Sequence, residues 1–201
     1  MVTILVFIPI LLVSVLLFKD NLIPQTSASK AEKTKTELSI LEAVKLAYPS
    51  ALKWNKNAQL YQAINIDLDK PGKSIGSNGK RKYWNVKFVV PDTNKTFLVT
   101  IHEGKVDQTN DFTVKNTDPF PKQELIRLSD VKYDSPQLLK KALEKGGIHP
   151  GKDWAKGYNF MLTKDPETNI TLMLVIGWNS EYKKMVSVYF NATNGKLLLS
   201  K

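Results

Sequence analysis

The chain has 201 residues, of which 42% are hydrophobic and 24% charged, and its formal net charge is +10. This composition predicts a packed core rather than a disordered chain. The absence of cysteine excludes disulfide frameworks, thiolate metal sites and cysteine nucleophiles, and the presence of only two histidines excludes a histidine-rich metal centre. The excess of positive charge predicts attraction to anionic surfaces.

Residues 2–18 form an apolar run without a charged side chain. A membrane-spanning helix needs about 17–25 such residues, whereas a cleaved signal peptide has a shorter apolar core and a basic start. No Lys or Arg precedes this run, and the small-residue stretch 26–28 lies ten residues beyond its end. We therefore expect residues 1–20 to be a membrane anchor rather than a removed signal, followed by a polar linker over residues 21–35. If the segment is cleaved, the protein is secreted.

The charges after the run conflict with an exported domain. Lys19, Lys30, Lys33 and Lys35 all follow it, and the positive-inside rule places that side in the cytoplasm. A cysteine-free domain behind an N-terminal anchor is nevertheless a common exported arrangement. We expect a cell-membrane protein with a single N-terminal span and an extracytoplasmic C-terminal domain.

A helix is predicted to begin after Ser39, which has Glu42 three residues later. This capping box lets each side chain accept from a backbone N–H at the helix start. Apolar residues recur at helical spacing until Pro49, which is expected to end the helix. Alternating segments around 64–68, 83–90 and 97–101 then predict strands with one buried face. A turn at Gly104 precedes a short, apolar fourth strand.

The second half of the chain repeats this order. Asp134 precedes Ser135 and Pro136, a cap followed by proline at the start of a helix. The predicted apolar face consists of Leu138, Leu139, Ala142 and Leu143, and the helix ends at Gly146. Strands are expected around 158–162, 170–178 and 186–190, and Asn194-Gly195 predicts a tight hairpin before the last strand. In the second of these strands, the residues predicted to share the buried face are Ile170, Leu172, Leu174, Ile176 and Trp178.

The sequence thus predicts an α+β fold of two repeated units, each one helix followed by an antiparallel β-meander. Residues 36–109 form the first unit, residues 110–127 a connector and residues 128–201 the second unit. Trp54 and Trp154 each follow a predicted helix, and Gly104 and Gly195 each lie in a closing turn, so each pair is predicted to hold equivalent structural positions. The tryptophans are 100 residues apart, whereas the glycines are 91 apart. The first unit carries roughly nine extra residues by this offset, which we assign to the glycine-rich, basic loop 69–82.

The closing hairpin carries a family resemblance. Residues 186–197, VSVYFNATNGKL, resemble the terminal strand, hairpin and strand of the PepSY domain, and residues 100–106, TIHEGKV, resemble a shortened copy. The resemblance covers most of residues 36–201 as a tandem pair. It implies an extracytoplasmic protein-binding module, similar to the inhibitory pro-segments of thermolysin-type peptidases. The family has no catalytic residues to carry over.

Several motifs imitate chemical sites without the required context. Residues 72–76 match G-x-S-x-G, but a hairpin and a strand surround them instead of the strand and helix of a nucleophile elbow. A phosphate-binding loop would need its first glycine at position 67, which is Asp67. A calcium loop would need a ligand at position 71 and a bidentate acid at position 78, which are Pro71 and Asn78. His102 and His149 belong to different units and are interpreted as solvated. We therefore expect no enzyme activity, no cofactor and no metal.

The extra loop is the predicted partner-binding site, because function is expected where two similar units differ. Its candidates are Lys70, Lys73, Lys80, Arg81 and Lys82. A solvated, flexible tip is the alternative interpretation. In either case the loop should be exposed, and replacing residues 80–82 by Ser should leave folding intact.

Two functions follow from these observations. The first is a non-enzymatic extracytoplasmic protein-binding module, such as a regulator or inhibitor of an envelope peptidase. The alternative is a structural cell-envelope protein whose basic surface binds anionic wall polymer or lipid. A nucleic-acid partner is not expected, since no helix-turn-helix signal is present and the aromatic residues fall on strands.

Overall fold

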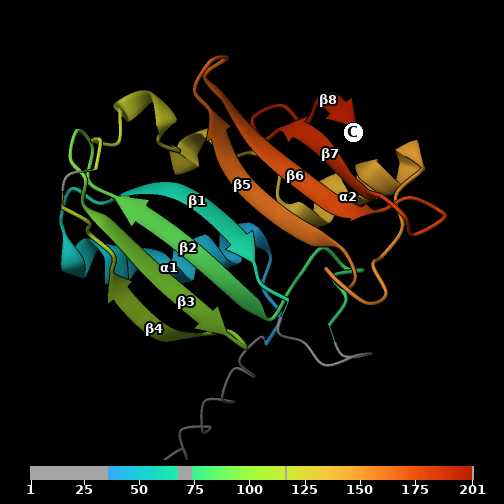
Figure 1. Cartoon of the computed structure of the whole chain (residues 1–201), viewed down its shortest axis with the longest axis horizontal. Coiled ribbons are helices and arrows are strands. Elements are labelled where there is room, and N and C mark those ends of the chain that lie inside the picture. The colour runs from blue at the N-terminus through green and yellow to red at the C-terminus, as the bar shows by residue number, and fades with distance from the viewer. Residues whose placement is uncertain (1–35, 68–73, 116, 201) are drawn as a thin grey trace, which may run out of the picture. The chain divides into compact units, whose positions relative to one another are not determined.

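The computed structural model describes residues 36–67, 74–115 and 117–200. The predicted anchor, the predicted linker, Lys70 and Lys73 lie outside these residues. The described chain contains an eight-stranded antiparallel sheet and two α-helices (Figure 1). The predicted α+β class is confirmed.

Each half of the chain places a helix before four strands. The first half contains α1 (Ile40–Trp54), β1 (Gln59–Asn65), β2 (Tyr83–Val89), β3 (Thr96–His102) and β4 (Lys105–Asp111). The second contains α2 (Ser135–Lys145), β5 (Asn159–Asp165), β6 (Ile170–Trp178), β7 (Met185–Asn191) and β8 (Leu197–Ser200). Two short 3-10 helices, η1 (Lys122–Glu124) and η2 (Leu128–Asp130), connect the halves.

The two meanders form one sheet because β1 pairs with β5. The strand order is β4-β3-β2-β1-β5-β6-β7-β8. The central pair is short, with the register Ala63↔Leu162 and Ile64↔Met161. Beyond it, the buried Asn65 side chain donates to Asn159 Oδ1 (2.7 Å) and accepts from the Phe160 N–H (2.6 Å). Side-chain amides thus continue the pairing where the backbones diverge.

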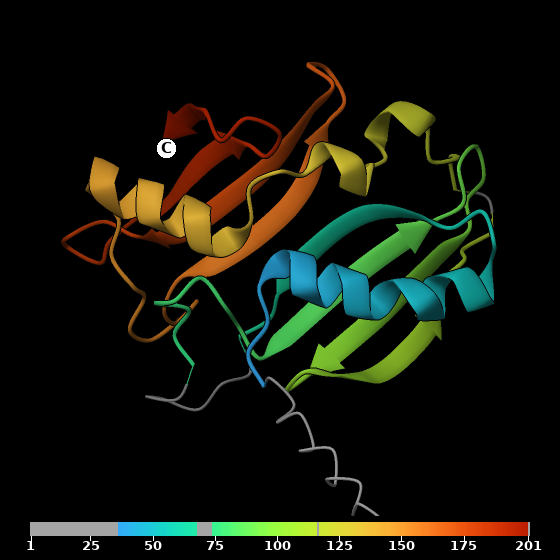
Figure 2. The ribbon, with the colours of Figure 1, turned by 180° about the vertical axis from the view of Figure 1, so that it is seen from behind.

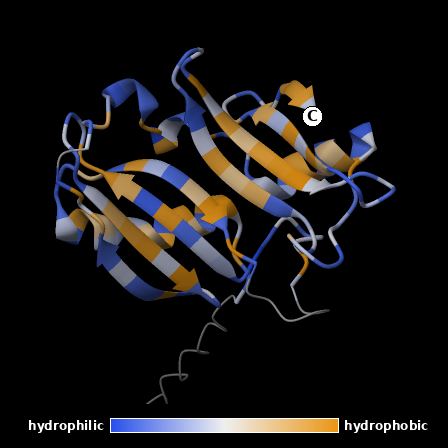
Figure 3. Cartoon of the chain, in the orientation of Figure 1, coloured by the Kyte–Doolittle hydropathy of each residue, from blue (hydrophilic) through white to orange (hydrophobic). Residues whose placement is uncertain are grey.

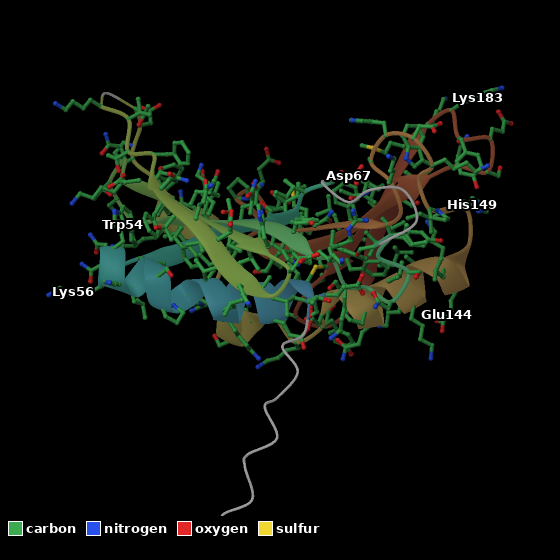
Figure 4. All side chains as sticks on the ribbon, turned by 90° about the horizontal axis from the view of Figure 1, so that it is seen from below. Trp54, Lys56, Asp67, Glu144, His149 and Lys183 are labelled. Atoms are coloured by element: carbon green, nitrogen blue, oxygen red, sulfur yellow. The ribbon has the colours of Figure 1, made fainter. Side chains whose placement is uncertain are left out.

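Both helices cover the same face of the sheet (Figures 2 and 4). The core lies between the helices and that face, and its largest fully buried aromatic side chains are Trp84, Phe88, Phe160 and Phe190. We call the opposite face the open face, because no helix of the described residues covers it (Figure 4). An antiparallel sheet tolerates one such face, since successive side chains alternate across it.

The N-termini of the two helices meet, and each supplies a cap. The predicted capping box at Ser39 and the predicted cap at Asp134 are present, and Gln137 completes a second capping box that was not predicted. The Ser39 hydroxyl donates to Asp134 Oδ2 (2.5 Å), and the Ile40 N–H donates to Ser135 Oγ (3.1 Å). Asp134 also accepts from the Leu41 N–H (3.2 Å), so one carboxylate serves the positive ends of both helix dipoles.

Several predicted details of the helices and strands are wrong. Helix α1 does not end at Pro49 but continues to Trp54, because the fully buried Ala51 and the stacking of Trp54 on Phe97 outweigh one lost hydrogen bond. Leu143 of α2 is exposed rather than part of its buried face. Strand β1 begins at Gln59, earlier than predicted, and β4 is exposed along its whole length and, apart from Val106, polar instead of apolar.

Candidate functional site

Strand β6 is apolar on both of its faces. Met173 and Val175 belong to the core under the helices. The alternate residues Leu172, Leu174, Ile176 and Trp178 therefore lie on the open face. Their prediction as the buried face was wrong. Alternation specifies a face only where the other positions are polar, and the positions between them in ITLMLVIGW are apolar as well.

One transverse row of paired residues shows how the open face changes along the sheet. From β1 to β8 it reads Ile64, Met161, Leu174, Tyr189 and Leu199, each paired with the next. In the other direction from Ile64, the row continues through Asn85, Thr100 and Gln108. The second half of the sheet is accordingly the more apolar one (Figure 3).

We call the open face over β5–β8 the apolar half. Its apolar residues are Met161, Leu172, Leu174, Ile176, Trp178, Tyr189 and Leu199, and the polar Thr163, Ser187 and Asn191 share this face at its flanks. Leu174, at its centre, is only 4% exposed although no helix covers it, since its apolar neighbours close around it. Apolar surfaces of this kind are candidates for interaction sites.

The apolar half runs to an uncharged edge strand. The side chains of Leu197, Leu198 and Leu199 in β8 are each about 40% exposed (38–41%). The opposite edge, β4, carries Lys105, Asp107 and Asp111, charges of the kind that protect sheet edges from association. The apolar half of the face therefore ends at the apolar edge strand β8, and the more polar half ends at the charged edge strand β4.

A hollow of about 380 Å³ lies at the other end of the open face. Leu98, Phe112, Val114 and Phe120 supply its apolar lining, and Lys87 of β2 lines it as well. The segment that follows β4 stays beside the sheet through hydrogen bonds from the Phe112 N–H to Thr96 O (2.8 Å) and from the Phe120 N–H to Thr93 O (2.9 Å).

Lys87 occupies an unusual position for a lysine. Its Nζ lies 4.6 Å from the ring centroid of Tyr61 and 4.9 Å from that of Phe120. Burial lowers the pKa of Lys87, and burial together with the charge of Glu124 raises the pKa of Tyr61.

The described part of the predicted basic loop, residues 74–82, is not an exposed tip. Arg81 is fully buried, and its guanidinium donates to Lys156 O (2.8 Å) and Tyr158 O (3.2 Å) and pairs with Asp67 (3.4 Å). Its backbone pairs with Leu38 in both directions. Exposure of this residue was predicted wrongly because the second half of the chain, distant in sequence, supplies the acceptors.

The neighbouring lysines have partners from other elements. Lys80 pairs with Glu42 (2.9 Å), and Lys82 pairs with Glu103 (3.1 Å). Gly79 packs so closely on Pro136 that an added Cβ would lie 2.3 Å from its Cα. Residues 74–82 thus join α1, β5 and α2, and a partner-binding role for Lys80, Arg81 and Lys82 stays a prediction.

The four residues predicted to be equivalent fall into two kinds. Gly104 and Gly195 both have positive φ angles, 79° and 68°, at hairpin turns where glycine is favoured. Trp54 stacks on Phe97 and donates to Asp111 Oδ2 (2.8 Å). Trp154 instead is 67% exposed and lies edge-on to Trp178, so the two tryptophans have different surroundings.

The two histidines contact different residues. His102 pairs with Asp107 (3.2 Å) and lies edge-on to Tyr83, whereas His149 forms a backbone bridge with Trp178. Within residues 36–67, 74–115 and 117–200, no group of three or more His, Cys, Asp or Glu side chains is placed to hold a metal ion. No helix in the same part of the chain is long and apolar enough to cross a membrane.

Comparisons with known proteins identify the fold. No family model matches the chain, and no curated protein matches it. A crystal structure of a "putative lipoprotein" from Clostridium difficile 630 has the same fold, with a TM-score of 0.57 and 14% identity. The match covers 85% of this chain and 95% of that one. At this identity the likeness concerns the fold alone, and the PepSY resemblance stays a prediction.

Proposed function

We propose that this chain is a non-enzymatic protein-binding module of the cell envelope, and that it binds its partner through the apolar half of the open face. The observation that carries the proposal is the apolar row Met161–Leu174–Tyr189–Leu199, which reaches an uncharged sheet edge. Burying such a surface stabilises a complex by roughly 25 cal/mol per Å² before the costs of association.

The charge of the domain defines the partner further. Residues 36–201 contain 25 Lys and Arg and 17 Asp and Glu, a net +8. We expect a protein with an apolar patch bordered by acidic side chains, because complementary charge speeds association and aligns the surfaces. An envelope peptidase is the partner class that the PepSY resemblance implies, and the tandem-repeat interpretation of the two helix-and-meander halves belongs to this proposal.

The apolar run at the N-terminus and the structural neighbour both support an envelope location. The apolar run 2–18 is long enough to anchor the chain, and the 201 residues contain no cysteine for a thioether-linked lipid. The structural neighbour from Clostridium difficile is described as a lipoprotein, which is consistent with a related location by another means of attachment.

Site-specific photo-crosslinking in cells tests the proposal. A benzoylphenylalanine is placed at Leu199 or, as the matched control, at Gln108, the two ends of the same transverse row on opposite edge strands. We expect one protein adduct from position 199 and none from position 108. The identified partner, once purified, should bind the wild-type domain. Its affinity for the Tyr189→Asp variant, which places a charge beside the central Leu174, should be at least about 10-fold lower.

Other outcomes refute or redirect the proposal. Equal adducts from both positions would remove the special role of the apolar half. Adducts with lipid or wall polymer alone, released by salt, would favour the structural function through a basic surface. An adduct with a second copy of the chain would indicate self-association along β8. If the partner is a peptidase, its turnover should change when the domain is added.

A further inference from the structure

Lys87 is a half-buried ammonium group without an acidic partner among the described residues. Lys80, Lys82 and Lys122 each pair with a carboxylate at 2.8–3.1 Å, but Lys87 contacts the rings of Tyr61 and Phe120 instead. Ring faces replace only part of the hydration that an ammonium loses on burial. A carboxylate placed beside it would therefore gain a strong, charge-assisted hydrogen bond.

The hollow next to this ammonium is lined by apolar side chains that remain uncovered. Phe112 and Val114 are 54% and 58% exposed, and Leu98 and Phe120 complete the apolar wall. Its volume of about 380 Å³ lies in the range of small-molecule sites, about 300–1,000 Å³. Exposed apolar walls around one cation fit an amphiphilic anion.

The other polar groups of the hollow are largely engaged with the protein. The Asn94 side chain donates to Val114 O (2.7 Å), and the Thr117 hydroxyl donates to the same oxygen (3.1 Å). The exposed carboxylate of Asp118 also lines the hollow and repels an anionic ligand, twice as strongly when the ligand carries two negative charges as when it carries one. The lining therefore favours a monoanion over a sugar, a dicarboxylate or a phosphate.

We propose that this hollow binds a monocarboxylate with an apolar body. Its carboxylate accepts a hydrogen bond from Lys87 Nζ, and its apolar part lies against Leu98, Phe112 and Val114. A medium-chain fatty acid and the C-terminal residue of an apolar peptide share this chemistry. The inference is independent of the apolar half, which lies over β5–β8 at the other end of the open face.

Calorimetric titration of the purified protein with decanoate, below its micelle concentration, tests this inference. We expect saturable binding of one decanoate with a Kd below about 1 mM. Decan-1-ol, which keeps the apolar body and lacks the charge, should bind at least about 10-fold more weakly, because the charged hydrogen bond is lost. Lys87→Met should weaken decanoate by a similar factor, and Lys87→Arg, which keeps the cation, should retain binding.

The control is Lys105→Met, which removes an exposed lysine from β4 outside the hollow and should leave decanoate binding unchanged. Acetyl-leucyl-leucine as free acid and as amide forms the second arm. Tighter binding of the acid peptide assigns the site to a chain terminus, and tighter binding of decanoate assigns it to a fatty acid. Equal affinity for decanol and decanoate would overturn the inference, as would binding of neither carboxylate. The comparison of the two probes uses the wild-type protein, so it stands even if Lys87→Met does not fold.

Discussion

Replacing the buried Arg81 by Met should strongly destabilise the domain. The guanidinium donates to Lys156 O and Tyr158 O and pairs with Asp67. Hydrogen bonds from a charged group contribute about 1.5–3 kcal/mol each. The two carbonyl bonds therefore account for about 3–6 kcal/mol. The pair with Asp67 adds little, because its carboxylate is partly exposed and 3.4 Å away. We expect a loss of about 3–5 kcal/mol, because two carbonyl groups lose their charged donor.

Such a loss is large for a domain with a typical unfolding free energy of about 5–15 kcal/mol. It corresponds to a decrease in melting temperature of about 6–20 °C for a domain of this size. Urea unfolding followed by circular dichroism measures the free energy directly. Lys82→Met is the matched control, since its pair with Glu103 lies at the surface and should contribute at most about 1 kcal/mol.

Two results would refute this role of Arg81. A loss below about 1 kcal/mol for Arg81→Met, or equal losses for the two variants, would show that the guanidinium does not hold the halves together. The expectation from sequence that Ser at positions 80–82 leaves folding intact is reversed by the same geometry. Loss of partner binding in that triple variant would report unfolding rather than a lost contact.

Three further predictions concern backbone fit, capping and pH. Gly146→Ala, at φ 79° and ψ 174° in open space, should lower the unfolding free energy by about 1–3 kcal/mol through backbone strain alone. Gly79→Ala should cost more than Gly146→Ala, because φ is +77° and the added Cβ would also lie 2.3 Å from Pro136 Cα. Thermal unfolding of both variants separates clash from strain. Asp134→Ala should cost about 2 kcal/mol or more by urea unfolding, since it removes a cap from α2 and a bond to α1, and a cost below about 0.5 would contradict that link. Burial lowers the pKa of Lys87 below its ordinary 10.5, so the unfolded state binds more protons just below that pH, and the free energy of unfolding rises as the pH approaches 10.5. Lys87→Met should lose this gain in urea unfolding, and identical pH profiles of the two proteins would count against the burial.

Local signals in the sequence predicted the elements well. The capping box at Ser39, the helix cap at Asp134 and the glycine turns at Gly104 and Gly195 appear where they were expected. Strands β2 and β3 follow their alternation closely, with Trp84, Val86 and Phe88 buried. These features depend on neighbours within a few residues, and short-range chemistry is what a single sequence carries most directly.

Features that depend on distant residues were not predictable. Pro49 lies inside α1 because packing on the sheet outweighs the lost hydrogen bond. The position of Arg81 depends on carbonyls 75 and 77 residues away, so its basic neighbours in sequence gave the wrong impression of an exposed tip. The surroundings of Lys87 combine Tyr61 of β1 with Phe120 of the segment after β4. The sequence around Lys87 showed only that it belongs to the polar positions of an alternating strand.

The sequence by itself thus determined the α+β class, the helix starts, the hairpin turns and most strands, because backbone propensity and periodicity act locally. Only the tertiary structure decided that β1 and β5 join the meanders into one sheet, and that both helices cover the same face. It also decided which side of β6 is open. A strand that is apolar at nearly every position fits either face, and the choice follows from the packing of Met173 and Val175 under the helices.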